Sequence, residues 1–265
     1  MHFHVTKSTA VIGLFVALSG SSQAALIDRG SGLIFDTVLN VTWLQDTNYA
    51  RTSGYQVPGR AADDLIVNGM MDWRESMAWA DSLIFYDATR GVSWSDWHLP
   101  SVSPVQGGAH FVSAVGTVGQ TDDSYNISAP GSVYAGTQAS HLAYLYFNTL
   151  GNVGRCPVTG GFDACTDPGA PRTVAFNAGP FINLDGFRWT NSNQDLPYPA
   201  DAWAFVFQGS LYGQQNAFNA TGYYGRRLAW AVRDGDVGVV PEPGTGVLVG
   251  AALLLGLALR LRARG

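Results

Sequence analysis

The sequence predicts an α+β domain in which two helices pack against a small antiparallel sheet with long loops. Short alternating or apolar stretches near both ends of the domain are typical of strands. Two segments, beginning at Asp72 and at Ser140, combine helical periodicity with a preferred N-cap residue. The remainder is rich in Gly, Asn, Ser and Asp, the residues that form turns and caps.

The first 24 residues are predicted to be a cleaved signal peptide. Lys7 precedes an apolar run from Ala10 to Leu18, and Ser22 and Ala24 occupy the small-residue positions of a cleavage site. Nine apolar residues are too few to span a membrane, which favours a cleaved signal over an anchor. We therefore expect an exported chain that begins at Ala25 and holds one domain over residues 25–236.

The charge of the exported part excludes nucleic acid as a partner. Without Lys7, Glu242 and three C-terminal arginines, 11 Arg face 19 acidic residues, so the net charge is −8 and no Lys remains. Phosphate binding needs a basic face, which this composition does not supply. The chain has 8 Trp and 12% aromatic residues, which indicates a folded core rather than a disordered passenger.

The domain opens with a predicted hairpin. Gly30-Ser31-Gly32 is a turn signal, and the segments Leu33–Phe35 and Asn40–Leu44 follow as two short strands. Near the other end, Ala202–Phe207 and Leu228–Arg233 are predicted to be the arms of a long hairpin with an irregular tip. Between these pairs, Trp94–Ser101 is typical of an extended buried segment.

Two helices are predicted between the strands. The first begins at Asp72 with Glu75 in capping-box spacing, and the second runs from Ser140 to Leu150 before Gly151. The residues expected on their buried faces are Trp73, Met77, Ala80 and Ile84 in the first, and Leu142, Leu145, Tyr146 and Leu150 in the second.

The two cysteines, Cys156 and Cys165, are predicted to form a disulfide. An even pair of close cysteines in an exported chain favours that reading. A metal site is the alternative, but two sulfurs without a nearby histidine make a poor one. We expect no metal and no cofactor.

The C-terminal segment, residues 237–265, has three parts in a fixed order. Pro241-Glu242-Pro243 comes first, and an apolar run from Val247 to Leu259 follows. The predicted transmembrane helix, residues 244–261, would be about 27 Å long, close to the ~30 Å of a hydrocarbon core. Arg260, Arg262 and Arg264 would stay on the cytoplasmic side, so the domain would face outward.

This order resembles the PEP-CTERM sorting signal of Gram-negative bacteria. The resemblance implies a membrane enzyme, exosortase, as a partner that processes the tail. It also implies passage through the inner membrane to the cell envelope, cell surface or extracellular matrix. An ordinary short membrane anchor is the alternative.

The domain itself is similar to the Lcl C-terminal domain family, a domain of unknown function. The similarity rests on the order of several motifs: Leu26–Leu44, Met71-Asp72-Trp73, Ala78-Trp79-Ala80, Asp96–Ser101, Trp189–Ser192, Ala202–Phe205 and Ala229–Asp236. It implies a C-type-lectin-like fold and an adhesin-like or glycan-binding role, and it does not imply catalysis. The family's Trp-Arg-Leu-Pro-Thr is Trp97-His98-Leu99-Pro100-Ser101 here, so an ion pair made by that Arg is in doubt.

No catalytic motif is present. The sequence lacks a nucleophile elbow, a His-Glu-x-x-His zinc motif, a Walker loop and a dinucleotide fingerprint. His98 sits in a Trp-rich motif and is expected to be structural, whereas His141, just after an N-cap, is expected to be exposed. We therefore predict that the protein is not an enzyme and name no catalytic residue.

The candidate ligand-binding region is the loop segment from Gly151 to Ala200. Sugar rings stack on aromatic faces, and Asn and Asp side chains hydrogen-bond to hydroxyls. The alternative is that Trp189 closes the core while the polar residues only solvate a loop. The candidates are Trp189, Asn191, Asn193, Asp195 and Tyr198.

These observations together predict an exported envelope or matrix protein that binds exopolysaccharide, another glycan or a partner surface without catalysis. Two alternatives stay open, a secreted carbohydrate-active enzyme on a lectin-like scaffold and a purely structural coat protein. The ligand, the oligomeric state, calcium dependence and the fate of the C-terminal helix do not follow from the sequence.

Overall fold

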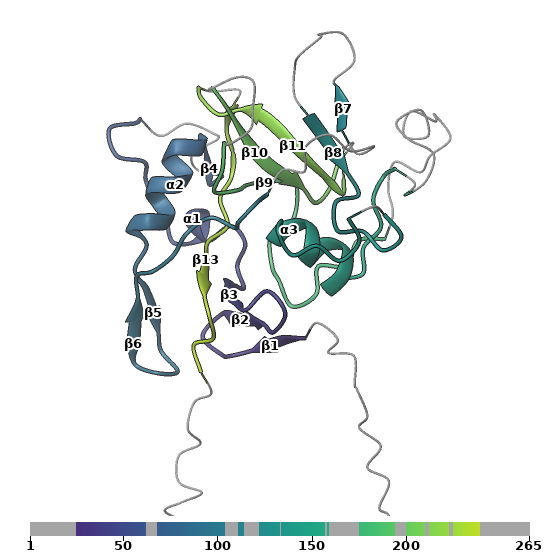
Figure 1. The fold of residues 1–265 in the computed structure, drawn as a ribbon. Coiled ribbons are helices and arrows are strands. Elements are labelled where there is room, and N and C mark those ends of the chain that lie inside the picture. The colour runs from purple at the N-terminus through teal and green to yellow at the C-terminus, as the bar shows by residue number, and fades with distance from the viewer. Residues whose placement is uncertain are drawn as a thin grey trace, which may run out of the picture.

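The computed structural model shows a mostly β domain with few helices, an α+β fold of short strands (Figure 1). The predicted signal peptide and the tail beyond Gly238 lie outside the described residues. Among the residues described, no helix has the length and apolar character needed to cross a bilayer. The structure describes residues 25–61, 68–103, 111–113, 122–132, 134–156, 158, 175–193, 200–209, 212–222 and 225–238, with the backbone alone for 111–113 and 122–125.

The first sheet joins the beginning and the end of the domain. Strands β1 (Leu26–Asp28), β2 (Leu33–Asp36) and β3 (Val41–Leu44) form an antiparallel meander, and β13 (Val232–Asp234) pairs with β3. The predicted opening hairpin is therefore confirmed.

The larger sheet has seven strands, ordered β4-β12-β9-β10-β11-β8-β7, and a separate hairpin forms from β5 and β6. Its central pair, β10 and β11, is antiparallel over six residues. The bounds are β4 Met70–Met71, β5 Phe85–Asp87, β6 Val92–Trp94, β7 Phe111–Ser113, β8 Asp122–Tyr125, β9 Phe187–Trp189, β10 Asp201–Val206, β11 Gln214–Asn219 and β12 Arg227–Leu228.

The late strands differ from the prediction in two ways. The partner of β10 is β11, which lies inside the segment predicted to be an irregular tip. The predicted strand Leu228–Arg233 is divided, because β12 pairs with β4 and β9 in the large sheet while β13 crosses to β3 in the small one. The residues between them, Ala229 to Ala231, are fully buried where the two sheets meet.

Helix α2 (Trp73–Ser82) begins as predicted. Asp72 accepts a hydrogen bond from the Glu75 backbone N–H, and the Glu75 carboxylate accepts one from the Asp72 N–H, so the capping box is complete. The predicted position of Ile84 on the buried face is wrong, because the helix ends at Ser82 and Ile84 is 69% exposed. A short helix, α1 (Tyr49–Thr52), precedes it in the chain.

The second predicted helix is present in two parts. Helix α3 (His141–Tyr144) passes into the wider turn η1 (Leu145–Thr149), where the Leu150 N–H donates to the Leu145 carbonyl, five residues back. Ser140 is the N-cap residue, as predicted, but its side chain makes no capping hydrogen bond, since its hydroxyl donates to Gln215 Oε1 at 2.7 Å. All four residues predicted for its buried side are buried.

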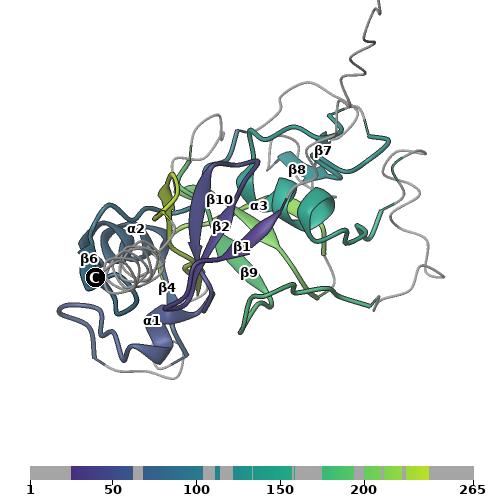
Figure 2. The same ribbon diagram turned by 90° about the horizontal axis from the view of Figure 1, so that it is seen from below.

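Aromatic side chains fill the space between the two sheets and the helices. Trp43 and Trp230 lie 4.6 Å apart between ring centroids, and Phe181 packs edge-on against both. A view from below shows α2 and α3 on opposite flanks of the molecule, with β9 and β10 between them (Figure 2). Helices α2 and α3 therefore border two separate regions of the surface, with the core between them.

Candidate binding site

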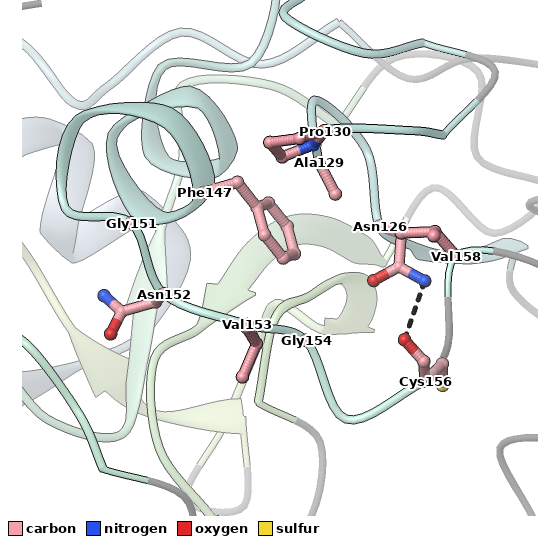
Figure 3. A pocket seen from close by; sticks show the side chains of 10 residues that line it. All are labelled: Asn126, Ala129, Pro130, Phe147, Gly151, Asn152, Val153, Gly154, Cys156 and Val158. Carbon is pink, nitrogen blue, oxygen red and sulfur yellow. Dashed lines mark hydrogen bonds between the residues drawn. The ribbon is translucent and has the colours of Figure 1, made fainter.

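The larger described cavity lies beside η1, and its volume is about 480 Å³ (Figure 3). One wall comes from Asn126, Ala129 and Pro130, which follow β8. The other is the segment from Phe147 to Val158. Gly151 to Val158 belongs to the loop region in which the sequence predicts binding, but none of the described side chains predicted to bind lines the cavity.

Close backbone packing gives the cavity its floor. A Cβ on Gly154 would clash with Asn126 Oδ1 and lie 3.3 Å from the Phe147 ring, so any larger residue would require these side chains to shift. A Cβ on Gly213 would in turn meet the Gly154 Cα at 2.7 Å. The Asn126 amide donates to the Cys156 carbonyl at 3.0 Å and holds the two walls together.

An asparagine pair fixes the loop that leaves η1. Asn152 Nδ2 donates to the Asn177 carbonyl at 2.9 Å, and the Asn177 N–H donates to Asn152 Oδ1 at 2.8 Å. The Tyr146 hydroxyl donates to the Val153 carbonyl at 2.9 Å. The wall is therefore held by hydrogen bonds, which favours a preformed cavity.

Cys156 lines the same cavity and is disulfide-bonded. Cys165, its predicted partner, lies outside the described residues, so the pairing itself stays a prediction.

The described lining of this cavity contains no ionisable side chain. Its polar groups are the amides of Asn126 and Asn152, and its rim carries Val153 and Val158, which are 57% and 39% exposed. Such a site can hold an uncharged, partly apolar group. Among its described residues, no side chain could transfer a proton or act as a nucleophile.

Trp189 is a core residue, which corrects its assignment as a ligand contact. The indole is fully buried on β9, and its Nε1 donates to the Met71 carbonyl at 3.0 Å. A sugar could not reach either ring face. The alternative stated for the sequence, that Trp189 closes the core, is confirmed.

The neighbouring polar candidates lie at the surface or outside the described residues. Asn191 is half-buried and its N–H donates to the Pro100 carbonyl, whereas Asn193 is exposed. Asp195 and Tyr198 are outside the described residues. None of the described candidates lines the larger cavity.

A smaller cavity of about 260 Å³ lies between α2 and the segment Trp97–Leu99. Asp81 and His98 are its ionisable lining groups. His98 Nδ1 lies 2.8 Å from the Leu99 carbonyl, and Nε2 lies 3.2 Å from Asp234 Oδ1. His98 is thus held by the fold, as predicted for a structural histidine.

An ion pair between Arg233 and Asp96 forms close to His98. Arg233 donates from Nε and Nη2 to the two oxygens of Asp96, at 2.9 and 2.7 Å, and its guanidinium lies 4.2 Å from the centroid of the Trp94 ring. The hydrogen bond from Arg233 lowers the pKa of Asp96. These contacts join the segment 94–98 to β13.

Among the described residues, two carboxyls have a raised pKa. Burial raises the pKa of Asp36, which is fully buried and accepts the N–H groups of Val38 and Leu39. Burial also raises the pKa of Asp201. Neither lines either described cavity.

No family model, curated protein or solved structure matches this chain. The two resemblances carried by the sequence therefore stay proposals, and the chemistry of the site rests on its own residues. Sequence reasoning did not find Asn126 or Phe147. Asn126 follows a short polar strand and Phe147 has the periodicity of an ordinary core residue, so neither carried a signal of its role.

Proposed function

We propose that this chain is an exported, non-enzymatic binding protein of the Gram-negative cell envelope or extracellular matrix. Its tail would be the substrate of an exosortase, and its C-terminal helix would hold it in the inner membrane in transit. The order Pro241-Glu242-Pro243, apolar run and arginines supports this proposal.

The finer fold assignment, a C-type-lectin-like domain, belongs to the same proposal. Its support is the pairing of β13 with β3, which places the last described strand beside the first hairpin, and the two helical regions on opposite flanks. Residues 175–186, which precede β9 and form no helix or strand, fit that fold as well.

The observation that carries the binding role is the character of the larger cavity. It is held open by hydrogen bonds, it is largely apolar, and its described lining has no charge. An acidic sugar would find no counter-charge there, whereas an acyl substituent would place its methyl group against Phe147 and Val153. We therefore assign the ligand as a neutral sugar unit that carries an acetyl or similar acyl group.

A glycan array tests this assignment. The full-length protein in mild detergent should bind acetylated neutral glycans on the array. It should no longer bind the same glycans after they have been chemically deacetylated. Binding to acidic glycans alone, or equal binding before and after deacetylation, would refute the ligand class.

The sorting role has its own test. Replacing Pro241, Glu242 and Pro243 with alanine should leave a full-length form in the inner membrane of an exosortase-containing host. Delivery of this variant to the matrix in normal amount would show that the motif is not a sorting signal.

A further inference from the structure

The β5–β6 hairpin carries three of the six large apolar side chains that are exposed among the described residues. Ile84 is 69% exposed, Tyr86 63% and Val92 40%. Ile84 and Tyr86 lie two residues apart and face away from the core, since Phe85 and Asp87 between and after them are buried. Val92 pairs with the buried Asp87 and therefore lies on the other face of the hairpin. We call Ile84 and Tyr86 the hairpin patch.

The tip of this hairpin is bonded to the place where the described chain ends. Arg90 Nε and Nη2 donate to the Gly238 carbonyl at 3.2 and 2.7 Å, and Nη2 also donates to the Arg29 carbonyl at 2.9 Å. Arg29 in turn pairs with Asp236. Figure 1 shows the hairpin and the end of β13 pointing to the same end of the molecule.

A short connection follows Gly238. Five residues separate it from Gly244, where the predicted membrane segment begins, and the six Cα–Cα steps between the two glycines span at most about 20 Å. Gly238, to which Arg90 at the hairpin tip is hydrogen-bonded, therefore lies within about 20 Å of the start of that segment.

We infer that the hairpin patch rests on the outer surface of the lipid bilayer while the protein still carries its tail, an inference that depends on the proposed membrane segment. Tyrosine and aliphatic side chains favour the membrane interface. The arginines at the tip are paired with Asp87 and Asp236, so the contact is apolar and does not depend on anionic lipid. It would hold Pro241-Glu242-Pro243 close to the membrane surface, within reach of a membrane enzyme.

Collision measurements on a nitroxide label test the contact. The label is placed on the full-length protein in phosphatidylcholine nanodiscs through Ser93→Cys, because Ser93 is exposed and pairs with Tyr86 on the outer face. The control label is placed through Ile182→Cys. Ile182 is 53% exposed and forms a β-bridge with Asp46. Asp234 pairs with Val41 at the first residue of β3, whereas Asp46 follows the last, so Ile182 lies away from the end of β13.

If the hairpin patch contacts lipid, the accessibility of the Ser93 label to a water-soluble nickel chelate should be about fivefold lower than that of the Ile182 label. The Ser93 label should remain accessible to oxygen, which dissolves in lipid. The double change Ile84→Ser with Tyr86→Ser should restore access of the chelate. If the protein co-floats with lipid and the nickel chelate reaches both labels equally, the lipid contact of the hairpin patch is refuted, but the membrane anchor is not. Exclusion of both oxygen and chelate also overturns the contact, because protein would then cover the patch. A protein that does not co-float overturns the membrane anchor and the contact together.

Discussion

His141 should make the domain less stable as the pH falls from 6.5 towards 4. Its backbone N–H donates to the Ser101 carbonyl, and its ring meets Trp43 edge-on with 6.5 Å between centroids. Among the described residues, Nδ1 has no hydrogen-bond partner. The prediction that His141 is exposed is therefore wrong, because the ring is largely covered. Burial, together with the nearby charge of His98, lowers its pKa from 6.5 to about 4.

The direction and size of the effect follow from linkage. Between pH 6.5 and 4 the unfolded chain binds a proton at this site that the folded protein does not bind, so protonation favours unfolding. The full difference between the two pKa values corresponds to at most about 3 kcal/mol. Because part of the ring reaches solvent, we expect about 1–3 kcal/mol, or about 2–12 °C in Tm for a domain of this size.

The test compares the wild type with His141→Phe, which keeps a ring against Trp43 and removes the titration. Thermal unfolding of both proteins is followed by circular dichroism from pH 7.5 to 4. The difference in Tm between variant and wild type should rise steadily in favour of the variant below pH 6.5. Asp36, whose raised pKa acts in the opposite direction, contributes equally to both proteins and cancels. Parallel Tm curves over this pH range would refute the assignment of a buried neutral histidine.

Three further predictions concern the stability of the folded domain. Asp72→Ala should cost about 1 kcal/mol by removing the cap of α2, whereas Glu75→Gln should keep the capping box, and urea unfolding separates the two. Cys156→Ser should cost about 2.5–3 kcal/mol, and a reducing agent should lower the Tm of the wild type but leave this variant unchanged. Gly154→Ala should destabilise the domain by about 1–3 kcal/mol through the clash with Asn126, and an unchanged melting curve would mean that the packing described at the cavity floor is wrong.

The parts of the fold that the sequence predicts are those determined by local chemistry. The capping box of Asp72 and Glu75 and the turn at Gly30-Ser31-Gly32 depend on neighbouring residues alone, and both are present. Strand β11 was missed because Gln214, Gln215 and Asn216 have the composition of a loop. Their burial between β10 and β8, with Gln215 accepting the Ser140 hydroxyl, is a tertiary effect that local propensity does not contain.

The sequence indicated a loop region, and the described side chains it named there do not line the larger described cavity. The segment beginning at Gly151 does border a cavity, but the opposite wall comes from Asn126 to Pro130, which are distant in sequence. Trp189 was misassigned because an aromatic residue followed by asparagines is typical both of a sugar-binding site and of the edge of a hydrophobic core. What distinguishes the two is a tertiary contact with β4, whose Met71 carbonyl accepts a hydrogen bond from the Trp189 indole N–H.

Retention on an acetylated exopolysaccharide column tests the central claim most directly. Val153→Glu places a charge at the rim of the uncharged cavity, while Ile182→Glu is the matched control, 53% exposed against 57% and outside the lining. Both variants of the full-length protein should keep the wild-type Tm. We predict that the wild type and Ile182→Glu are retained and that Val153→Glu elutes in the void. Equal retention of the two glutamate variants would show that this cavity does not bind the glycan.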